Sequence, residues 1–373
     1  MKLSKLDSII ICLSPIFMAY KFFIPGVSIS EAFMAMSLFF HILYGTFWKS
    51  LKLSIVIFIF IISLIHILYI SSTGMSENLG YLRLAKFFIL ISFITLAFEN
   101  IDKNSLIKIM CLVIYINFFA LFFQYAIYLL TGSAVPLVIP FLPLVNEDIS
   151  LESINLVLSS NFRPGGLFME PSHLSYFFFF SALFIFKSRL YNKELILVII
   201  AISLFSTFSS FGFMSGLLVV GLVFLNASQE MKLFLIVLLL IVVPINIASY
   251  SYLIFEIPQI ARLINPESVA VTGRLLAGQS LIEQLNTSQQ YIGLGFGNFQ
   301  MNGQVNGISY LRLSFGNIGL AIIFSILILY CLFNLNPFIL MLVAIIVAIS
   351  FFSALLFSSF LPIILVNFLL KKS

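Results

Sequence analysis

Charged residues are scarce in this sequence. Asp, Glu, Lys and Arg make up only 9% of its 373 residues, whereas about a quarter of an average soluble domain is charged. Hydrophobic residues make up 61%, among them 44 Phe, and the mean hydropathy is +1.16. This composition excludes an ordinary soluble domain and predicts an all-α polytopic membrane protein embedded in a lipid bilayer.

Cysteine is rare as well. The three cysteines lie far apart inside apolar runs, without the spacing of a disulfide framework or a zinc site: Cys12, Cys111 and Cys331. We therefore expect no disulfide and no structural metal.

Clusters of basic residues are also missing. The formal net charge is +5, but the lysines and arginines are scattered singly and form no basic patch or stripe. This pattern excludes nucleic acid as a partner. The placement of the few charges relative to the membrane is more informative.

Long apolar runs recur along the whole chain. A helix needs about 20 mostly apolar residues to cross a bilayer. The first run has a basic start but no small-residue cleavage site, so we expect it to be retained as a span. On this measure the sequence predicts twelve spans, near residues 8–24, 30–47, 53–71, 79–97, 105–130, 172–187, 194–209, 211–227, 232–249, 308–331, 338–351 and 355–370.

Lysine follows the positive-inside rule. With a cytoplasmic N-terminus, eleven of the thirteen lysines lie in inner loops or at inner helix ends, and Lys21 and Lys86 are the exceptions. The sequence thus predicts one transmembrane domain over residues 1–373 with both termini in the cytoplasm. The two long connections, 131–171 and 250–307, then fall on the outer side, and loops of this length in a compact protein are usually functional.

Arginine opposes the rule, because five of the six arginines fall in outer loops or outer helix halves: Arg83, Arg163, Arg262, Arg274 and Arg312. The planar guanidinium binds phosphate through paired hydrogen bonds and stays charged when partly buried. We therefore expect these arginines, with Lys86 one helical turn after Arg83, to bind a phosphorylated ligand. The alternative is that they pair with outer carboxylates such as Glu77.

The segment FRPGGLFMEPSH, residues 162–173, gathers charged groups beside a run of four phenylalanines. Pro171 suits the first turn of a helix whose N-terminus faces outward, where free backbone N–H groups favour an anion. Glu170 and His173 would project from one side of that turn. The alternative is that Glu170 caps the helix and His173 packs at the interface.

The residues before this turn complete the motif. Pro164 holds Arg163 in an extended conformation, and the two glycines that follow allow the segment to fold back over the start of the helix. The stretch GLGFGNF at 293–299 is interpreted as a turn and not as a nucleotide loop, because no strand and helix flank it.

This segment resembles the Arg-x-x-Gly-x-Phe-x-Glu-Pro-Ser signature of bacterial O-antigen and capsular polysaccharide polymerases. The stretches TGRLLAGQSLIEQL, YIGLGFGNF and SYLRLSFGNIGLAIIF follow in the order of that family's second outer loop and next span. The family places an arginine in the turn that corresponds to TFSS, where this chain has Ser210. The resemblance implies a fold similar to the type C glycosyltransferases, in the bacterial cytoplasmic membrane, with the two long loops forming the active-site face.

The resemblance also implies the chemistry. The expected partners are a glycan donor and a glycan acceptor, both linked to undecaprenyl pyrophosphate, and a chain-length regulator protein is left open. Arg163 and Arg274 are expected to stabilise the departing pyrophosphate, with Arg83, Arg262, Arg312 and Lys86 behind them. Glu170 is expected to be the general base and His173 the second choice.

Neither a cofactor nor a metal is expected, since the three aspartates are isolated and form no Asp-x-Asp pair. Two other functions stay open. An O-antigen ligase would transfer the finished chain to a lipid A core, and a lipid-linked oligosaccharide flippase would only move it.

Overall fold

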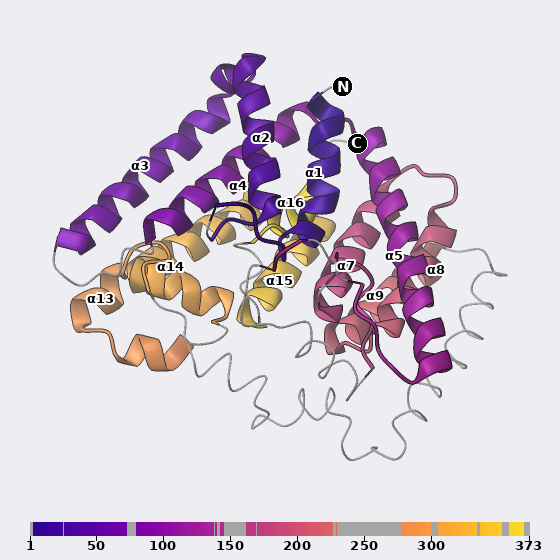
Figure 1. Ribbon diagram of the computed structural model, residues 1–373. Helices are drawn as coiled ribbons and strands as arrows, with labels where there is room; N and C mark the ends of the chain where they lie inside the picture. Colours follow the sequence, from indigo (N-terminus) through magenta and orange to yellow (C-terminus); the bar gives the residue numbers. More distant parts are fainter. Residues whose placement is uncertain are drawn as a thin grey trace. The chain divides into compact units, whose positions relative to one another are not determined.

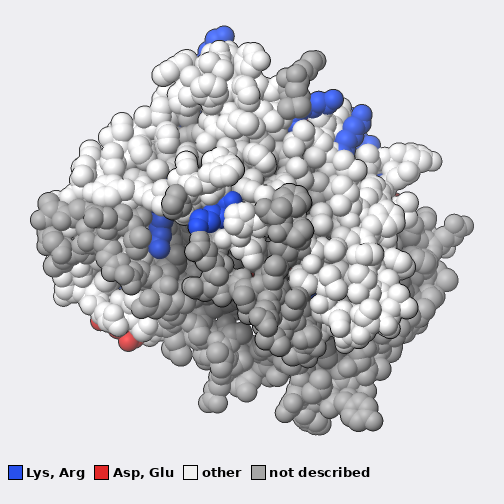
Figure 2. All heavy atoms as spheres, viewed as in Figure 1, with Lys and Arg blue, Asp and Glu red and all other residues white. Residues whose placement is uncertain are grey.

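The computed structural model describes residues 3–24, 26–72, 80–137, 139, 142–144, 162–168, 170–226, 229, 278–299, 305–333, 336–352 and 358–368. These residues form helices and, apart from two isolated β-bridges, no β structure (Figure 1). On the face shown in Figure 2 most of the described surface is uncharged, and lysine and arginine appear only in separate places. The prediction of an all-α chain is confirmed for this part of the protein.

The helices follow the predicted apolar runs, and every predicted span except 232–249, which lies outside the described residues, overlaps one of them. In order they are α1 (Leu3–Phe17), α2 (Ile29–Leu43), the 3-10 helix η1 (Phe47–Lys49), α3 (Leu51–Ser72), α4 (Gly80–Asn100), α5 (Lys103–Thr131), α7 (Pro171–Lys187), α8 (Lys193–Ser206), α9 (Ser210–Asn226), α13 (Thr287–Ile292), α14 (Gly307–Phe333), α15 (Pro337–Phe352) and α16 (Leu361–Leu365).

Four of these helices are long and apolar enough to cross a membrane: α3, α4, α5 and α14. Helices α2, α9 and α15 are shorter but also apolar. The described residues thus contain membrane-spanning candidates, as the composition predicts. The number of twelve spans and the side on which each loop lies stay predictions.

Two predicted spans have different ends in the structure. The run near 8–24 is helical only to Phe17, after which Tyr20 and Lys21 form isolated bridges with Leu144 and Ser28. The run near 355–370 has a turn at residues 358–360, and its helix begins at Leu361. Pro362 explains this start, because proline has no N–H to donate and is tolerated only in the first turn of a helix.

The chain folds into two compact units, each built from separate stretches of sequence. Unit 1 contains α1, the start of α2, α5, α7, α8, α9 and most of α16. Unit 2 contains the end of α2, α3, most of α4, α13, α14 and α15.

Unit 1 is organised around α7. This helix packs against α8 and α9, and α5 packs against α8, α7 and α1 (Figure 1). All four side chains of the phenylalanine run from Phe177 to Phe180 are buried. A helix that is apolar on all sides in this way is typical of one surrounded by protein. The buried amide of Asn367 donates a hydrogen bond to the carbonyl of Phe180 at 3.1 Å. The first turn of α7 therefore belongs to a closely packed helix at the centre of unit 1.

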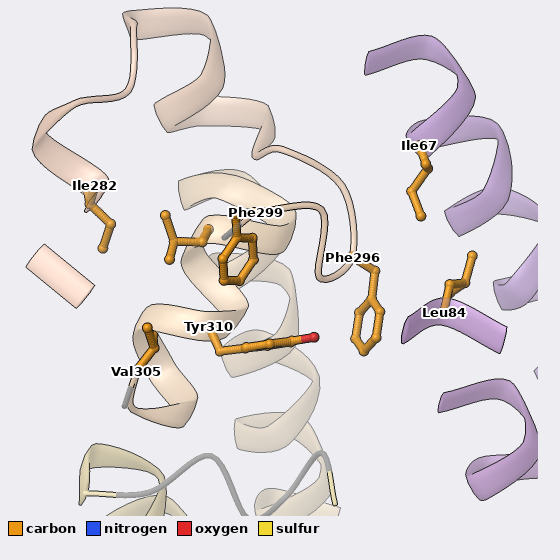
Figure 3. Close-up of a cluster of buried hydrophobic side chains, with 8 residues drawn as sticks. Ile67, Leu84, Ile282, Phe296, Phe299, Val305 and Tyr310 are labelled. Carbon is orange, nitrogen blue, oxygen red and sulfur yellow. The ribbon is translucent and has the colours of Figure 1, made fainter. Parts of the chain in front are cut away.

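Unit 2 has its own apolar core, which joins α3, α4 and α14 to the segment 293–299 (Figure 3). Three of its buried side chains are aromatic: Phe296 lies 5.6 Å from Tyr310 and Phe299 lies 5.3 Å from the same ring, measured between centroids. The buried members are Ile67, Leu84, Ile282, Phe296, Phe299, Val305, Tyr310 and Leu313.

Helix α5 begins with a side-chain cap, and this cap predicts a pH dependence. The carboxylate of Asp102 accepts hydrogen bonds from the backbone N–H groups of Asn104 and Ser105, both at 3.2 Å. The hydroxyl of Ser105 donates to the same carboxylate, and these bonds together lower the pKa of Asp102. A lowered pKa means that the cap stabilises the fold above the ordinary pKa of aspartate and is lost as the pH falls through the folded-state value.

We expect Asp102→Ala to lower the free energy of unfolding by about 1 kcal/mol at pH 7. Asp102→Asn keeps an acceptor without a titrating group, so its stability should fall less than that of the wild type between pH 7 and pH 3. Unfolding of the three proteins in detergent at both pH values measures this. Parallel pH curves for the wild type and Asp102→Asn would contradict it.

Candidate functional site

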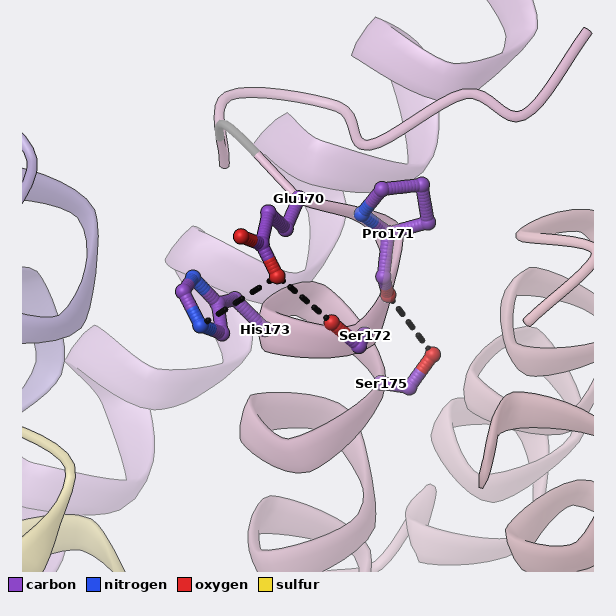
Figure 4. Close-up of polar contacts among 5 residues, drawn as sticks. All are labelled: Glu170, Pro171, Ser172, His173 and Ser175. Atoms are coloured by element: carbon purple, nitrogen blue, oxygen red, sulfur yellow. Dashed lines mark hydrogen bonds and ion pairs between the residues drawn. The ribbon is translucent and has the colours of Figure 1, made fainter. Parts of the chain in front are cut away.

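Glu170 stands at the N-cap of α7 without capping it. Its backbone is extended, with φ −119° and ψ 136°, and its side chain makes no capping hydrogen bond to the first turn. The carboxylate instead accepts a hydrogen bond from the hydroxyl of Ser172 at 3.1 Å and lies 3.7 Å from Nε2 of His173 (Figure 4). The side chain of Glu170 thus does not form the capping hydrogen bond of a helix cap.

The surroundings of Glu170 favour an available carboxylate. Its side chain is 51% exposed, whereas that of His173 is 22% exposed. Pro171 occupies the first turn, and the N-terminal end of the helix dipole stabilises a negative charge there. An exposed carboxylate at the start of a buried helix, with an imidazole beside it, is of the kind that can act as a general base.

The glycine turn before Glu170 folds back onto the start of α7, as the sequence predicts. The N–H of Phe168 donates to the carbonyl of Gly165 at 3.0 Å and closes the turn. A Cβ at Gly165 would lie 2.6 Å from the carbonyl oxygen of Phe168 and 3.4 Å from the backbone of Glu170. This close approach requires glycine and brings the chain that follows Arg163 against the residue that carries the carboxylate.

Two buried amides on α5 hold this turn. Oε1 of Gln124 accepts the N–H of Gly166 at 2.9 Å, and Oδ1 of Asn117 accepts the N–H of Leu167 at 3.0 Å. Each amide is fixed in turn, since Nδ2 of Asn117 donates to the carbonyl of Val113 and Nε2 of Gln124 donates to that of Val135. Two backbone N–H groups of the turn, those of Gly166 and Leu167, are therefore hydrogen-bonded to side chains of α5.

Sequence reasoning did not identify these two amides. Both lie within a long apolar helix and are almost completely buried. Polar residues inside a span usually have a specific partner, and that signal was present at positions 117 and 124.

Arg163 lies at the entry to the same turn. Its side chain is half-buried, and Pro164 after it is buried. Phe162 before it stacks on Tyr128 with ring centroids 4.0 Å apart and contacts Tyr125 edge-on at 5.0 Å. Aromatic packing before Arg163 and the glycine turn after it fix the backbone of this residue. Arg163 lies in unit 1, as do Glu170 and His173.

A cluster of three hydroxyl groups lies beneath the first turn of α7. The Ser175 hydroxyl lies 3.1 Å from that of Thr207 and 2.8 Å from that of Ser209, and it also donates to the carbonyl of Pro171. All three residues are buried. The turn between α8 and α9 thus supports the helix that follows Glu170.

This turn has a strained backbone. Phe208 has φ +47°, a value in the left-handed region that residues other than glycine seldom adopt. A Cβ at Gly212 would overlap the hydroxyls of Thr207 and Ser209, so the cluster also requires glycine there. The Ser210 side chain, at the position where the resembling family has an arginine, lies outside the described part of the structure.

In unit 2, Arg83 binds the glycine loop at residues 293–299. Its Nη1 donates to the carbonyls of Gly297 at 2.6 Å and Phe299 at 2.7 Å, and the guanidinium lies over the Phe299 ring at 6.0 Å. A Cβ at Gly297, where φ is +65°, would lie 2.8 Å from Cδ of Arg83. Through Nη1, the guanidinium of Arg83 therefore stabilises the loop.

The backbone amides of this loop are used within unit 2. Helix α14 is kinked at Gly316, where φ is +65°. Near the kink, the carbonyls of Leu313 and Ser314 accept the N–H groups of Leu294 and Gly295 at 2.8 and 3.0 Å. The loop docks on a broken helix, which agrees with its interpretation as a turn instead of a nucleotide loop.

Arg83→Lys should loosen this loop. A lysine ammonium is more strongly hydrated than a guanidinium and has no planar face to lie over the Phe299 ring, and bonds to charged groups contribute about 1.5–3 kcal/mol each. We expect the free energy of unfolding in detergent to fall by about 2 kcal/mol, whereas Arg189→Lys, at an exposed arginine, should leave it unchanged. Equal stability of the two variants would contradict a structural role for Arg83.

The remaining predicted phosphate ligands are placed only in part. Lys86 is half-buried on α4, one turn after Arg83. Arg312 on α14 donates from Nε to Oδ1 of Asn317 at 2.8 Å. Arg262 and Arg274 lie outside the described residues. The structure thus brings Arg163, Glu170 and His173 into unit 1, and Arg83, Lys86 and Arg312 into unit 2, and binding of a phosphorylated ligand by any of them stays a prediction.

Comparison of the chain with protein-family models, with curated proteins and with solved structures gives no match.

Proposed function

We propose that the protein is a polysaccharide polymerase of the bacterial cytoplasmic membrane. It joins oligosaccharide repeat units carried on undecaprenyl pyrophosphate, at the outer face. The observation that carries the proposal is the Glu170 carboxylate, which is exposed, makes no capping hydrogen bond and follows a turn held by α5. The ordered resemblance of the surrounding motifs to the polymerase family supports it.

The reaction is glycosyl transfer. A hydroxyl oxygen of the acceptor glycan attacks the anomeric carbon of the donor glycan and forms the new glycosidic bond. The bond from that carbon to the pyrophosphate oxygen breaks, and undecaprenyl pyrophosphate leaves with the bonding electrons. The acceptor proton passes to the Glu170 carboxylate, a step that typically contributes about a hundredfold or more.

The leaving group needs positive charge. Arg163 precedes the glycine turn that leads to Glu170. We assign Arg163 and Arg274 to stabilise the negative charge that develops on the pyrophosphate. Arg262, Arg312 and Lys86 are further ligands in the proposal. Arg83 contributes mainly through the loop that it holds.

His173 has a secondary role. Its Nε2 lies 3.7 Å from the Glu170 carboxylate, beside it but too far for a good hydrogen bond. In the proposal it orients the carboxylate through space and the Ser172 hydroxyl does so through a direct bond.

The topology follows from the lysine distribution. Both termini lie in the cytoplasm, and the loops 131–171 and 250–307 form the outer active-site face. Nucleotide sugars do not reach that face, so the donor carries its own leaving group. The proposed reaction uses neither a cofactor nor a metal.

An acceptor-exchange experiment tests the proposal. Purified protein receives one radiolabelled lipid-linked donor and either lipid-linked repeat units or lipid A core as acceptor. A polymerase extends the lipid-linked acceptor and releases one undecaprenyl pyrophosphate for each new bond. Transfer to lipid A core alone would indicate the ligase, and movement of the donor across a vesicle without release of pyrophosphate would indicate the flippase.

A further inference from the structure

Arg312 forms its hydrogen bond across a break in helix α14. The backbone of Gly316 has φ +65° and ψ −172°, which are not helical values. Nε of Arg312 donates to Oδ1 of Asn317 at 2.8 Å. In a continuous helix, side chains three or four positions apart are neighbours, whereas side chains five positions apart point to different sides. The break at Gly316 therefore brings the Asn317 amide to the Arg312 guanidinium.

Backbone contacts within unit 2 hold this break. The carbonyl of Ser314 accepts the N–H of Gly295 at 3.0 Å. A Cβ at Gly316 would overlap the carbonyl of Tyr291, and a Cβ at Gly293 would lie 2.6 Å from the backbone nitrogen of Gly316. The bond between Arg312 and Asn317 is thus an addition to a break that the backbone already holds, and its effect is to orient the guanidinium.

The partner of this guanidinium is a neutral amide. Both side chains are half-buried, and an arginine side chain is always charged in proteins. A hydrogen bond to an amide holds the guanidinium without neutralising it. The bond uses Nε and leaves the outer edge with its two Nη nitrogens, and such an edge binds a phosphate group through two parallel hydrogen bonds. Arg83, by contrast, donates from Nη1 to two carbonyls.

The part of α14 after the break fits the hydrocarbon layer. Residues 317–333 contain no charged side chain. At 1.5 Å per residue they are about 26 Å long, close to the roughly 30 Å of a bilayer core. Arg312 belongs to the shorter part of the helix, before the break. A span formed by residues 317–333 therefore places Arg312 at the membrane boundary, where the phosphate groups of lipids lie.

We propose that Asn317 positions Arg312 to bind the pyrophosphate of the lipid-linked substrate at the break in α14. Asn317 holds Nε, and the two Nη groups contact phosphate oxygens. Asn317 is a positioning residue, because it acts through Arg312 and does not touch the ligand. The inference rests on the proposed function for the identity of the ligand, but binding is measured without turnover, so the two can fail separately.

Asn317→Asp separates positioning from simple support of the helix. A carboxylate still accepts the Nε hydrogen bond, so unfolding in detergent should not be weakened. Its negative charge neutralises the guanidinium and repels phosphate. We expect the full-length protein in neutral detergent to bind radiolabelled undecaprenyl pyrophosphate about tenfold or more weakly. Asn336→Asp, the same exchange at an exposed residue just before α15, should bind it as the wild type does.

Two further variants check the cause. Asn317→Ala removes the acceptor but adds no charge, so its affinity should fall less than that of Asn317→Asp, and Arg312→Gln should bind at least as weakly as Asn317→Asp. Wild-type affinity in both Asn317 variants would show that the bond only supports the helix and would overturn the proposal. Displacement of the bound ligand by an equal concentration of phosphatidylglycerol would assign Arg312 to phospholipid headgroups and would overturn it as well.

Discussion

Glu170→Gln is expected to reduce glycan extension by about a hundredfold or more, because the amide cannot accept the acceptor proton. The variant keeps the size and shape of the side chain, and Ser172 can still donate to its oxygen. We expect its amount in the membrane and its unfolding in detergent to match the wild type. The measurement is the initial rate of extension of a lipid-linked acceptor at saturating donor.

Glu283→Gln is the matched control, since Glu283 is an exposed carboxylate of the loop 250–307 that bonds to Gln279 and has no role in the proposed reaction. It should extend glycans at the wild-type rate. His173→Asn should keep measurable extension at a reduced rate, as expected for a group that positions the Glu170 carboxylate. Normal extension by Glu170→Gln would contradict its assignment as the base.

Asn117→Ala is expected to impair both folding and extension. The change leaves the partly buried N–H of Leu167 without its acceptor, and the loss of such a hydrogen bond typically costs about 1 kcal/mol. Because that bond holds the turn before Glu170, we also expect extension to fall by about tenfold, the effect of roughly 1.4 kcal/mol on the barrier. Unfolding in detergent and extension rate, measured on the same preparations, give the two values.

Asn104→Ala on the same helix is the control for Asn117→Ala, because Asn104 is exposed and lies at the N-terminal end of α5. Gly166→Ala tests the same turn from the other side: its φ is +59° and a Cβ would lie 2.9 Å from Oδ1 of Asn117. Both turn variants should therefore lose extension together. A loss of stability without a loss of extension would show that the position of the turn does not matter for the reaction.

The sequence predicted the helices well because their signal is local. Apolar runs of span length mark α3, α4, α5 and α14 without ambiguity. Helix ends were less predictable where a turn interrupts an apolar run, as after Phe17 and before Leu361. Hydropathy does not distinguish an apolar turn from an apolar helix, and only Pro362 pointed to the second case.

The candidate site was predictable in its charged residues but not in its support. Rare charges in an apolar chain identify Arg163 and Glu170 by contrast alone. The partners Asn117 and Gln124 are separated from the glycine turn by 50 and 42 residues, counted to Leu167 and Gly166. Such pairing depends on tertiary packing, which no local pattern encodes.

Arg83 illustrates a different limit. Its outward position in a span predicts a ligand, yet in the structure Nη1 donates to two carbonyls more than 200 residues away. A guanidinium matches a pair of carbonyl oxygens as well as it matches phosphate oxygens, so residue type alone does not separate the two roles.

The most direct test of the account is polymerisation by the purified protein alone. The protein in liposomes receives only lipid-linked repeat units, without nucleotide and with a chelator present, and the products are separated on a gel. We predict a ladder of chains that differ by one repeat unit, absent with Glu170→Gln and present with Glu283→Gln. Failure to form any chain longer than the supplied unit, with the matched repeat unit shown to be bound, would contradict the proposed function.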